Sequence, residues 1–415
     1  MNRLELISNI ENPRQLEKLY RDNKTGFKTE FNLIYPELKD HQLADYWHER
    51  LNYESTEISW GSGKELIFVI IAGLIAGLIA KIPAMFNIDQ EFFYPRNIGF
   101  IVFPVLTAYF IWRNGLGANK IIFAAVPMLV AAIFINSFPD NNTSDTLILS
   151  CIHLPLILWA ILGYTYGGAQ IRDPHKKLEF LRYNGDLAIM TGLLLIAGVA
   201  LTGITIGLFS VIDINIEKIY FDYVAIFGLS AAPLVGSYIT QTNPNLVNKV
   251  SPVIAKIFTP LVLIMLVIYL GAILYTGKDP YNDRDFLMTF NGLLIGVMAI
   301  ILFSVAETFK KNENRIGSYM LLALSVVTII INGIAISAIL FRISEWGLTP
   351  NRMAVFGGNL LMLVNLCLVT FRLFKNITKK AAINDVENSI SNFLPVYILW
   401  AIVVTFVFPI LFHFK

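Results

Sequence analysis

The sequence predicts an all-α fold, a polytopic transmembrane helical bundle of about eleven spans preceded by a small N-terminal helical segment. Hydrophobic residues make up 55% of the 415 residues and charged residues only 15%, and the mean hydropathy of +0.61 lies outside the range of soluble domains. Apolar runs recur along the chain from Leu66 onward, and a run of about 20 residues crosses a bilayer as a helix. The net charge of +2 gives no indication of a nucleic-acid partner.

Residues 1–63 are expected to form a water-facing, cytoplasmic segment of two or three amphipathic helices. Apolar residues recur there at helical spacing, most clearly between Leu43 and Leu51, and Pro36 interrupts the pattern. The segment lacks the basic stretch, apolar core and small-residue site of a signal peptide. About sixty residues rarely build a stable core alone, so we expect the segment to pack on the bundle, residues 64–415, or on a cytoplasmic protein partner.

The apolar runs after this segment predict eleven membrane-spanning helices. The span that begins beside Pro95 and Arg96 is the shortest. The spans are placed at residues 66–86, 98–113, 120–138, 145–168, 185–212, 219–240, 252–276, 286–306, 316–341, 352–374 and 391–412.

The basic residues predict how these spans are oriented. With the N-terminus in the cytoplasm, 24 of the 32 lysines and arginines fall in the N-terminal segment and the inner loops, and eight fall on the other side. Because basic loops stay in the cytoplasm, this division favours a cytoplasmic N-terminus, a periplasmic C-terminus and an odd number of spans. The predicted location is a bacterial inner membrane.

The stretch R-I-S-E-W-G-L-T-P-N-R, Arg342 to Arg352, reads as a tight turn between two spans. Gly347 suits the left-handed residue that ends a helix, and Thr349 followed by Pro350 is an N-cap and first-turn pair. By the predicted orientation, this turn faces the periplasm.

Charged residues of this turn are candidates for binding. Arg342 and Glu345 are three residues apart, a spacing at which helical side chains meet. Arg352 lies in the first turn of the next helix, where the helix dipole disfavours a cation. We therefore expect Arg352 to have an anion or a carbonyl group as its partner.

A patch of outer arginines that binds an anionic solute or lipid headgroup is one interpretation of these residues, because arginine binds phosphate and carboxylate through two hydrogen bonds. The alternative is that nearby acids, such as Glu345, neutralise the arginines. The predicted patch consists of Arg96, Arg284, Arg342, Glu345, Trp346 and Arg352.

Polar side chains inside the spans are a second set of candidates, because a polar group in lipid costs free energy unless it has a partner. Hydrogen bonds between helices are the alternative to ligand binding for each of them. These intramembrane residues are His153, Asn291, Asn332, Asn359 and Asn365.

Glycine pairs four residues apart predict close approach between helices in the bundle interior. The pairs are Gly73 with Gly77, Gly163 with Gly167, Gly203 with Gly207, and Gly292 with Gly296.

Enzyme signatures are missing from the sequence. It contains no H-E-x-x-H, no G-x-S-x-G and no Walker-type phosphate-binding loop, so we expect no bound cofactor. Cys151 and Cys367 have no metal-ligand spacing, and no metal site is expected. Outer aspartates without fixed spacing leave a transferase acting on a lipid-linked substrate as an alternative. They are Asp140, Asp145, Asp213, Asp279 and Asp283.

The Arg342–Arg352 turn, the I-S-W-G stretch at Ile58–Gly61 and the segments K-I-P-A-M-F and F-F-Y-P-R-N resemble those of a bacterial multi-pass membrane family. This uncharacterised family is catalogued as domain of unknown function four-one-five-three. The resemblance spans nearly the whole chain and implies a permease-like membrane protein, but it carries over no catalytic residues.

Three functions remain open at this point. The first is a permease or transporter for an anionic or amphipathic envelope solute or lipid. The second is a membrane scaffold or signalling protein whose N-terminal helices dock a cytoplasmic partner, and the third is the transferase. In all three, membrane lipids are expected partners, and the sequence does not set the oligomeric state.

Overall fold

The computed structural model describes residues 3–22, 24–38, 41–52, 61–139, 141, 143–211, 214–244, 259–268, 270–271, 275, 281, 284–308, 315–378 and 383–415. These residues form helices and no strand, which confirms the predicted all-α fold class. The chain divides into two compact units, Met1–Ser59 and Trp60–Lys415, which we call unit 1 and unit 2.

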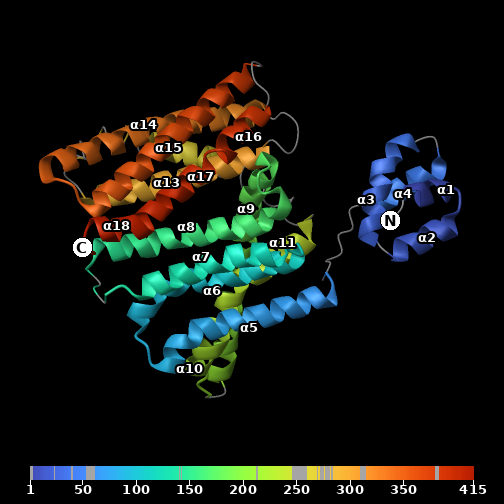
Figure 1. The fold of residues 1–415 in the computed structure, drawn as a ribbon, viewed down its shortest axis with the longest axis horizontal. Helices are drawn as coiled ribbons and strands as arrows, with labels where there is room; N and C mark the ends of the chain where they lie inside the picture. Colours follow the sequence, from blue (N-terminus) through green and yellow to red (C-terminus); the bar gives the residue numbers. More distant parts are fainter. Residues whose placement is uncertain are drawn as a thin grey trace. The chain divides into compact units, whose positions relative to one another are not determined.

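Unit 1 is a small helical unit with a core of its own. Phe27 and Phe31 are fully buried and stack with their ring centroids 5.6 Å apart. The indole of Trp47 lies 5.0 Å from the ring of Phe27. The helices are α1 (Arg3–Ser8), α2 (Pro13–Asp22), α3 (Lys24–Ile34), the 3₁₀ turn η1 (Tyr35–Glu37) and α4 (Gln42–Asn52), shown in blue in Figure 1.

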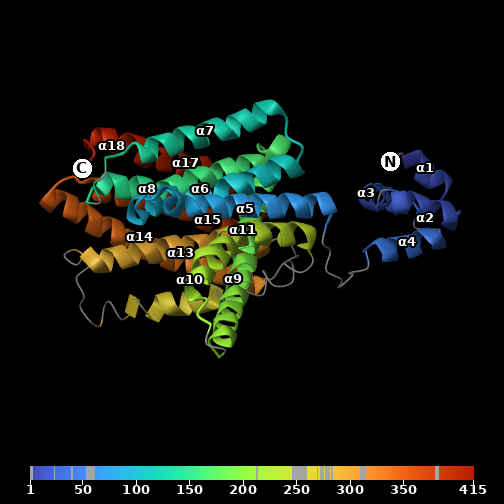
Figure 2. The same cartoon turned by 90° about the horizontal axis from the view of Figure 1, so that it is seen from below.

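Unit 2 is a bundle of long apolar helices. Figures 1 and 2 show α5 to α8 lying side by side, with α9 running across them. The helices are α5 (Gly63–Phe86), α6 (Gln90–Arg113), α7 (Ala118–Asn136), α8 (Asp145–Gly167), η2 (Gly168–Gln170), α9 (Pro174–Val211), α10 (Glu217–Ile219), the π-helix η3 (Tyr220–Ala225), α11 (Ile226–Thr242), α13 (Arg284–Thr308), α14 (Arg315–Trp346), α15 (Pro350–Ile377), α16 (Ile383–Ser391), α17 (Leu394–Ile402), the π-helix η4 (Val403–Val407) and α18 (Phe408–Leu411).

Within the described part of the chain, eight helices are long and apolar enough to cross a membrane. They coincide with eight of the eleven predicted spans. The span predicted at 98–113 lies in α6, a 24-residue helix that is not among the eight. The span at 286–306 lies in α13, where the apolar part is Phe290–Val305, and of the span at 252–276 the structure describes a helix at Thr259–Ile268. The rest of the span predicted at 252–276 lies largely outside the described residues.

Apart from α9, which runs across the others, the long helices run back and forth between two ends of unit 2. One end is where α5, α7 and α17 begin and where α6, α8 and α15 end. We call it the basic end, because four basic residues lie there: Arg113, Lys120, Lys177 and Lys375. At the opposite end lie the α14–α15 turn and the C-terminus, and we call it the C-terminal end (Figure 1).

Close glycine contacts join helices in pairs. A Cβ on Gly73 would lie 3.2 Å from Ala231, and one on Gly77 would overlap the ring of Phe227, so α5 and α11 approach each other closely there. In the same way, a Cβ on Gly99 of α6 would lie 2.9 Å from Leu158 of α8. These contacts make α5–α11 and α6–α8 two tightly packed pairs.

Two of the predicted glycine contacts are wrong. A Cβ added to Gly203, Gly207, Gly292 or Gly296 would meet no atom of a neighbouring side chain or helix within 4 Å among the residues that the structure describes. These glycines therefore lie on open helix faces and not in the bundle interior. The spacing predicts a small-residue stripe, but it does not determine whether a second helix covers that stripe.

The α14–α15 turn has the predicted geometry. Gly347 has a φ of +76°, the left-handed conformation that glycine adopts without strain. The Thr349 hydroxyl accepts a hydrogen bond from the backbone N–H of Arg352 at 3.3 Å, and Pro350 occupies the first turn of α15. A tight turn therefore places the neighbouring arginines at one end of unit 2.

Candidate functional site

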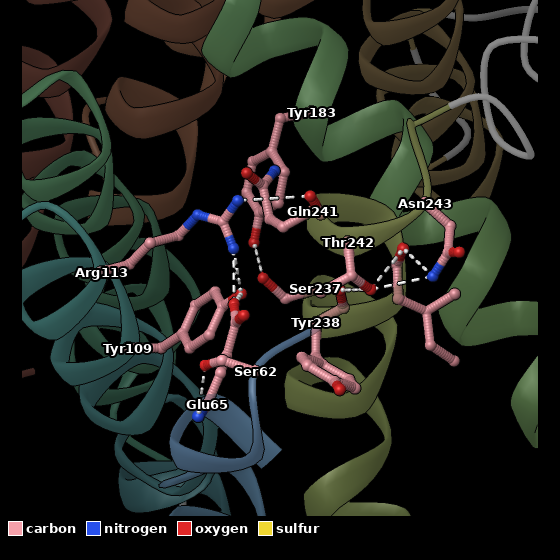
Figure 3. Close-up of polar contacts among 11 residues, drawn as sticks. Ser62, Glu65, Tyr109, Arg113, Tyr183, Ser237, Tyr238, Gln241, Thr242 and Asn243 are labelled. Atoms are coloured by element: carbon pink, nitrogen blue, oxygen red, sulfur yellow. Dashed lines mark hydrogen bonds and ion pairs between the residues drawn. The ribbon is translucent and has the colours of Figure 1, made fainter. Parts of the chain in front are cut away.

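A buried polar cluster at the basic end begins with the N-terminus of α5. Ser62 is the N-cap of this helix, and its hydroxyl accepts a hydrogen bond from the backbone N–H of Glu65 at 3.2 Å. Ser62 and Glu65 thus have the S-x-x-E spacing of a capping box. The Glu65 side chain points away from its own helix, toward α6 (Figure 3).

Helix α6 supplies two donors to this carboxylate. Tyr109 and Arg113 are four residues apart and therefore lie on one helical face. The Tyr109 hydroxyl donates to Oε1 of Glu65 at 2.7 Å, and Nη1 of Arg113 donates to the same oxygen at 2.5 Å. Arg113 also donates to the Tyr109 hydroxyl at 3.0 Å, so the three side chains form a closed set of contacts.

Arg113 extends the cluster to a third helix. Its Nη2 donates to the backbone oxygen of Gln241 at 3.3 Å, in the last turn of α11. The carbonyl groups at a helix C-terminus lack helical partners and attract cations. Arg113 therefore ties the end of α6 to the start of α5 and to the end of α11. We call Glu65, Tyr109, Arg113 and Gln241 the Glu65 cluster.

The ion pair of this cluster is largely removed from water. Glu65 is 8% exposed, and the side chain of Arg113 is about one-third exposed. A buried pair gains little net stability over apolar packing, because both charges lose their hydration, whereas loss of one partner is costly. The pair therefore favours one specific arrangement of α5, α6 and α11.

A second polar contact lies beside the Glu65 cluster. The hydroxyls of Tyr183 on α9 and Ser237 on α11 are 2.9 Å apart, and both residues are buried. Gly61 also lies against the cluster, because a Cβ there would come within 2.9 Å of the Glu65 carboxylate. Its φ of +60° also favours glycine. The backbone that enters α5 therefore passes close to the ion pair.

Chemically, the Glu65 cluster is suited to holding helices together. Oε1 of Glu65 already accepts hydrogen bonds from Tyr109 and Arg113, so this oxygen has little capacity left for a hydrogen bond from a substrate. Over the described residues, no group of three or more His, Cys, Asp or Glu side chains is arranged to hold a metal ion. The geometry favours a role in positioning α5, α6 and α11 against one another.

A comparison with known proteins finds no matching family model, no similar curated protein and no similar solved structure. The function therefore has to be argued from the geometry of the molecule itself.

At the C-terminal end, the structure brings together three residues of the predicted outer patch. The guanidinium groups of Arg342 and Arg352 lie 5.0 and 5.7 Å from the ring centroid of Trp346. Nη1 of Arg352 donates to the backbone oxygens of Trp346 and Gly347 at 2.8 and 2.7 Å. Of the two partners expected for Arg352, the structure shows the carbonyl. Glu345 is exposed in the same turn.

The other two arginines of the predicted patch are in different situations. Arg96 is 3% exposed, lies 3.9 Å over the ring of Phe92, and donates to the backbone oxygens of Phe92 and Pro139 at 2.9 and 3.5 Å. Its guanidinium is therefore held between the start of α6 and the end of α7. Arg284 begins α13, and its side chain lies outside the described residues.

Three of the predicted intramembrane asparagines meet between α13, α14 and α15. Nδ2 of Asn359 donates to Oδ1 of Asn291 at 2.6 Å, and Asn291 in turn donates to the backbone oxygen of Leu287 at 2.7 Å. Nδ2 of Asn332 donates to the backbone oxygen of Asn359 at 3.2 Å. The Asn359–Asn291 and Asn332–Asn359 contacts are hydrogen bonds between helices, one of the two interpretations of these sequence positions, whereas the Asn291–Leu287 contact lies within α13.

The remaining two intramembrane candidates have separate partners. Nδ2 of Asn365 donates to the Tyr397 hydroxyl at 3.0 Å, which joins α15 to α17. Nδ1 of His153 lies 2.8 Å from the backbone oxygen of Leu149 in its own helix. Of the outer aspartates considered for a transferase, Asp145 begins α8. The others, Asp140, Asp213, Asp279 and Asp283, lie outside the described residues.

Sequence reasoning missed the Glu65 cluster. Two local signals were available: the S-x-x-E spacing at Ser62 and Glu65, and the four-residue spacing of Tyr109 and Arg113. Each predicts only a helix start or a shared helical face. Glu65 and Arg113 are 48 residues apart, and no local pattern indicates that these two ends meet.

Proposed function

We propose that the protein is a permease-like transporter of the bacterial inner membrane that moves an anionic or amphipathic envelope solute or lipid. In this proposal the Glu65 cluster is a gate at the cytoplasmic end. The supporting observation is the buried ion pair of Glu65 and Arg113, which joins three helices at one end of the bundle. The proposal agrees with the permease-like character implied by the resemblance in sequence.

The packing of unit 2 supports a gating role. Glycine contacts hold α5 against α11, and a further glycine contact holds α6 against α8. The Glu65–Arg113 pair connects the first helix pair to the second at the basic end. If these two rigid pairs separate there, the ion pair breaks and the basic end opens, as in domain movements between two discrete arrangements.

Irregular helices provide further support. Prolines lie inside α5, α6, α7, α8 and α11, and π-helical segments occur at Tyr220–Ala225 and Val403–Val407. Such interruptions free backbone groups that can line a transport path, and π-helical turns often occur at functional sites. In this proposal the Arg342–Trp346–Arg352 turn forms the outer surface where the solute arrives or leaves.

The direct test is transport by purified protein in liposomes. Candidate substrates are a fluorescent phosphatidylglycerol, followed by quenching of label left in the outer leaflet, and a panel of labelled amphipathic anions followed by flux. We expect movement above the rate in protein-free liposomes. Glu65→Gln should raise the initial rate about fivefold, because losing about 1 kcal/mol from the closed state shifts its population by that factor.

The matched control is Glu17→Gln in unit 1, which removes a partly exposed carboxylate that also pairs with arginine. This variant should transport at the wild-type rate. A wild-type rate equal to that of empty liposomes for every substrate would reject the transport proposal. An equal rate in wild type and in Glu65→Gln would reject the gate while leaving transport in place.

The proposed orientation has a separate test. Single cysteines placed near each terminus, in a background without Cys151 and Cys367, report their compartment by reaction with a membrane-impermeant thiol reagent in whole cells. We expect labelling near the C-terminus and none near the N-terminus. Labelling of both cysteines, or of neither, would place the two termini in one compartment. Either result would reverse or remove the assignment of the Glu65 cluster to the cytoplasmic end.

A scaffold function is the second candidate, and unit 1 carries the observation that favours it. This unit has its own core, yet Leu33 and Tyr46 are 65% and 63% exposed. A protein partner that covered these two side chains would remove their apolar surface from water, which favours association. Leu33→Ser with Tyr46→Ser should abolish capture of such a partner while transport is unchanged. Loss of transport in this variant would instead connect unit 1 with the transport cycle.

A further inference from the structure

An apolar groove lies between α8, α9 and α17 at the basic end of unit 2. It has a volume of about 180 Å³ and is lined mainly by aromatic and aliphatic side chains, including Trp159, Phe180 and Ile398. Two cationic side chains, Lys176 and Lys177, complete its lining. The groove involves none of the residues of the Glu65 cluster.

Small residues on α8 create the hollow, and larger neighbours are fixed around it. Ala160 and Gly163 line one side, and a Cβ on Gly163 would come within 2.9 Å of the Phe180 ring. Nε1 of Trp159 donates to Oδ1 of Asn184 at 2.9 Å, which fixes the indole between α8 and α9. The groove is therefore a feature of packed, hydrogen-bonded helices.

The two lysines lie in the first turn of α9, which begins at Pro174. The helix dipole disfavours cations there, so neither lysine is placed to stabilise the helix. Lys176 forms an ion pair with Glu179 at 2.5 Å. The ammonium group of Lys177 has no hydrogen bond or ion pair to any residue that the structure describes. The groove thus combines an apolar interior with an available positive charge.

We propose that this groove binds one phospholipid with an anionic headgroup, with part of an acyl chain against Trp159 and Phe180 and the phosphate at Lys177 and Lys176. Basic pockets between membrane helices on the cytoplasmic side suit such headgroups. Pockets for whole drug-sized molecules measure about 300–1,000 Å³. The smaller volume here fits a segment of a chain whose remainder lies in the bilayer.

Lipid binding to the full-length protein in detergent tests this inference without reference to transport. Native mass spectrometry counts bound lipids during titration with phosphatidylglycerol, and a parallel titration uses phosphatidylcholine with the same acyl chains. We expect tighter binding of phosphatidylglycerol. Each lysine near an anionic lipid contributes about fivefold in affinity, so Lys177→Ala should weaken phosphatidylglycerol binding about fivefold and the Lys176→Ala, Lys177→Ala pair further.

Two further variants separate the headgroup from the chain. Lys120→Ala removes a lysine at the same end but outside the groove and should leave binding unchanged. Ala160→Leu fills the groove and should weaken both lipids. The proposal is overturned if phosphatidylglycerol and phosphatidylcholine bind equally, if Lys177→Ala binds as wild type does, or if Ala160→Leu has no effect. Full displacement of the lipid by glycerol phosphate would also overturn it, because the acyl chain would then contribute nothing.

Discussion

At the basic end, Arg113 binds a carboxylate that lies 48 residues earlier in the chain. At the C-terminal end, Arg352 binds the carbonyl oxygens of the turn that immediately precedes its own helix. The first contact joins separate helices and is largely buried, whereas the second is local and exposed. A change at Arg113 therefore affects how helices are held together, and a change at Arg352 affects mainly one turn.

The comparison also shows how the environment determines the role of an arginine. In the α14–α15 turn, the guanidinium of Arg352 donates hydrogen bonds to carbonyl oxygens within six residues of it. These acceptors stabilise the cation in the first turn of α15 without an external anion. In the Glu65 cluster, the same group is paired with a charge that has lost most of its hydration. Breaking the first contact should cost much less than breaking the second.

The largest effect is expected from Glu65→Ala. This change leaves the Arg113 guanidinium and the Tyr109 hydroxyl without their shared acceptor. Loss of one partner from a fully buried pair costs about 3–5 kcal/mol, and since Arg113 is about one-third exposed we expect about 2–3 kcal/mol. The measurement is the free energy of unfolding of the purified protein in mixed micelles.

Glu91→Ala is the matched control, because Glu91 is also a first-turn glutamate of a 24-residue helix but is exposed. It should cost less than about 0.5 kcal/mol. A double-mutant cycle with Arg113→Ala should give a coupling energy of at least about 1 kcal/mol. A coupling energy near zero would show that the Glu65–Arg113 pair does not differ energetically from a surface pair.

The asparagines that bond between α13, α14 and α15 provide an intermediate case between the two arginine sites. Asn359→Ala removes the donor to Asn291 and leaves the half-buried Oδ1 of Asn291 without this hydrogen bond, so we expect a loss of about 1–2 kcal/mol in the free energy of unfolding. Asn351→Ala, in the first turn of the same helix, should change it by less than about 0.5 kcal/mol. Equal effects of the two variants would show that the hydrogen bond between Asn359 and Asn291 does not contribute to stability.

The difference between local and long-range contacts also explains what the sequence predicts. The α14–α15 turn was predictable because Gly347, Thr349 and Pro350 act within a few residues of one another. Helix positions followed from apolar runs for the same reason. The Glu65–Arg113 pair was not predictable, because the meeting of two distant helix ends depends on how the whole bundle packs. The close helix contact predicted at Gly203 was wrong for the same reason, because whether a second helix covers that face also depends on how the bundle packs.

Arg352→Ala is expected to lower the free energy of unfolding by less than Glu65→Ala or Asn359→Ala does. It removes two exposed hydrogen bonds to carbonyl oxygens and the contact with the Trp346 ring, for a loss of about 1 kcal/mol. Arg352→Lys should recover part of this loss, because one ammonium group still reaches a carbonyl. Unfolding in mixed micelles measures both variants. If Arg352→Ala instead abolished transport with no loss of stability, the outer-patch interpretation would replace the capping role.

The smallest effect is expected from an exposed ion pair of unit 1, which extends the comparison to solvent. Hydrogen bonds from Arg21 and then Arg50 hold the pKa of the Glu17 carboxyl below its usual 4.5. A lowered folded-state pKa means that this contribution is present above about pH 4.5 and is lost as the pH falls through the lowered value. The protection of peptides from residues 3–52 in the full-length protein, taken as the exchange rate relative to the intrinsic rate at each pH, should therefore fall slightly below pH 4.5, and Glu17→Gln should remove that part of the change. If Glu17→Gln had the same pH profile as wild type, other carboxylates would account for the acid sensitivity, and the exposed pair would contribute nothing measurable.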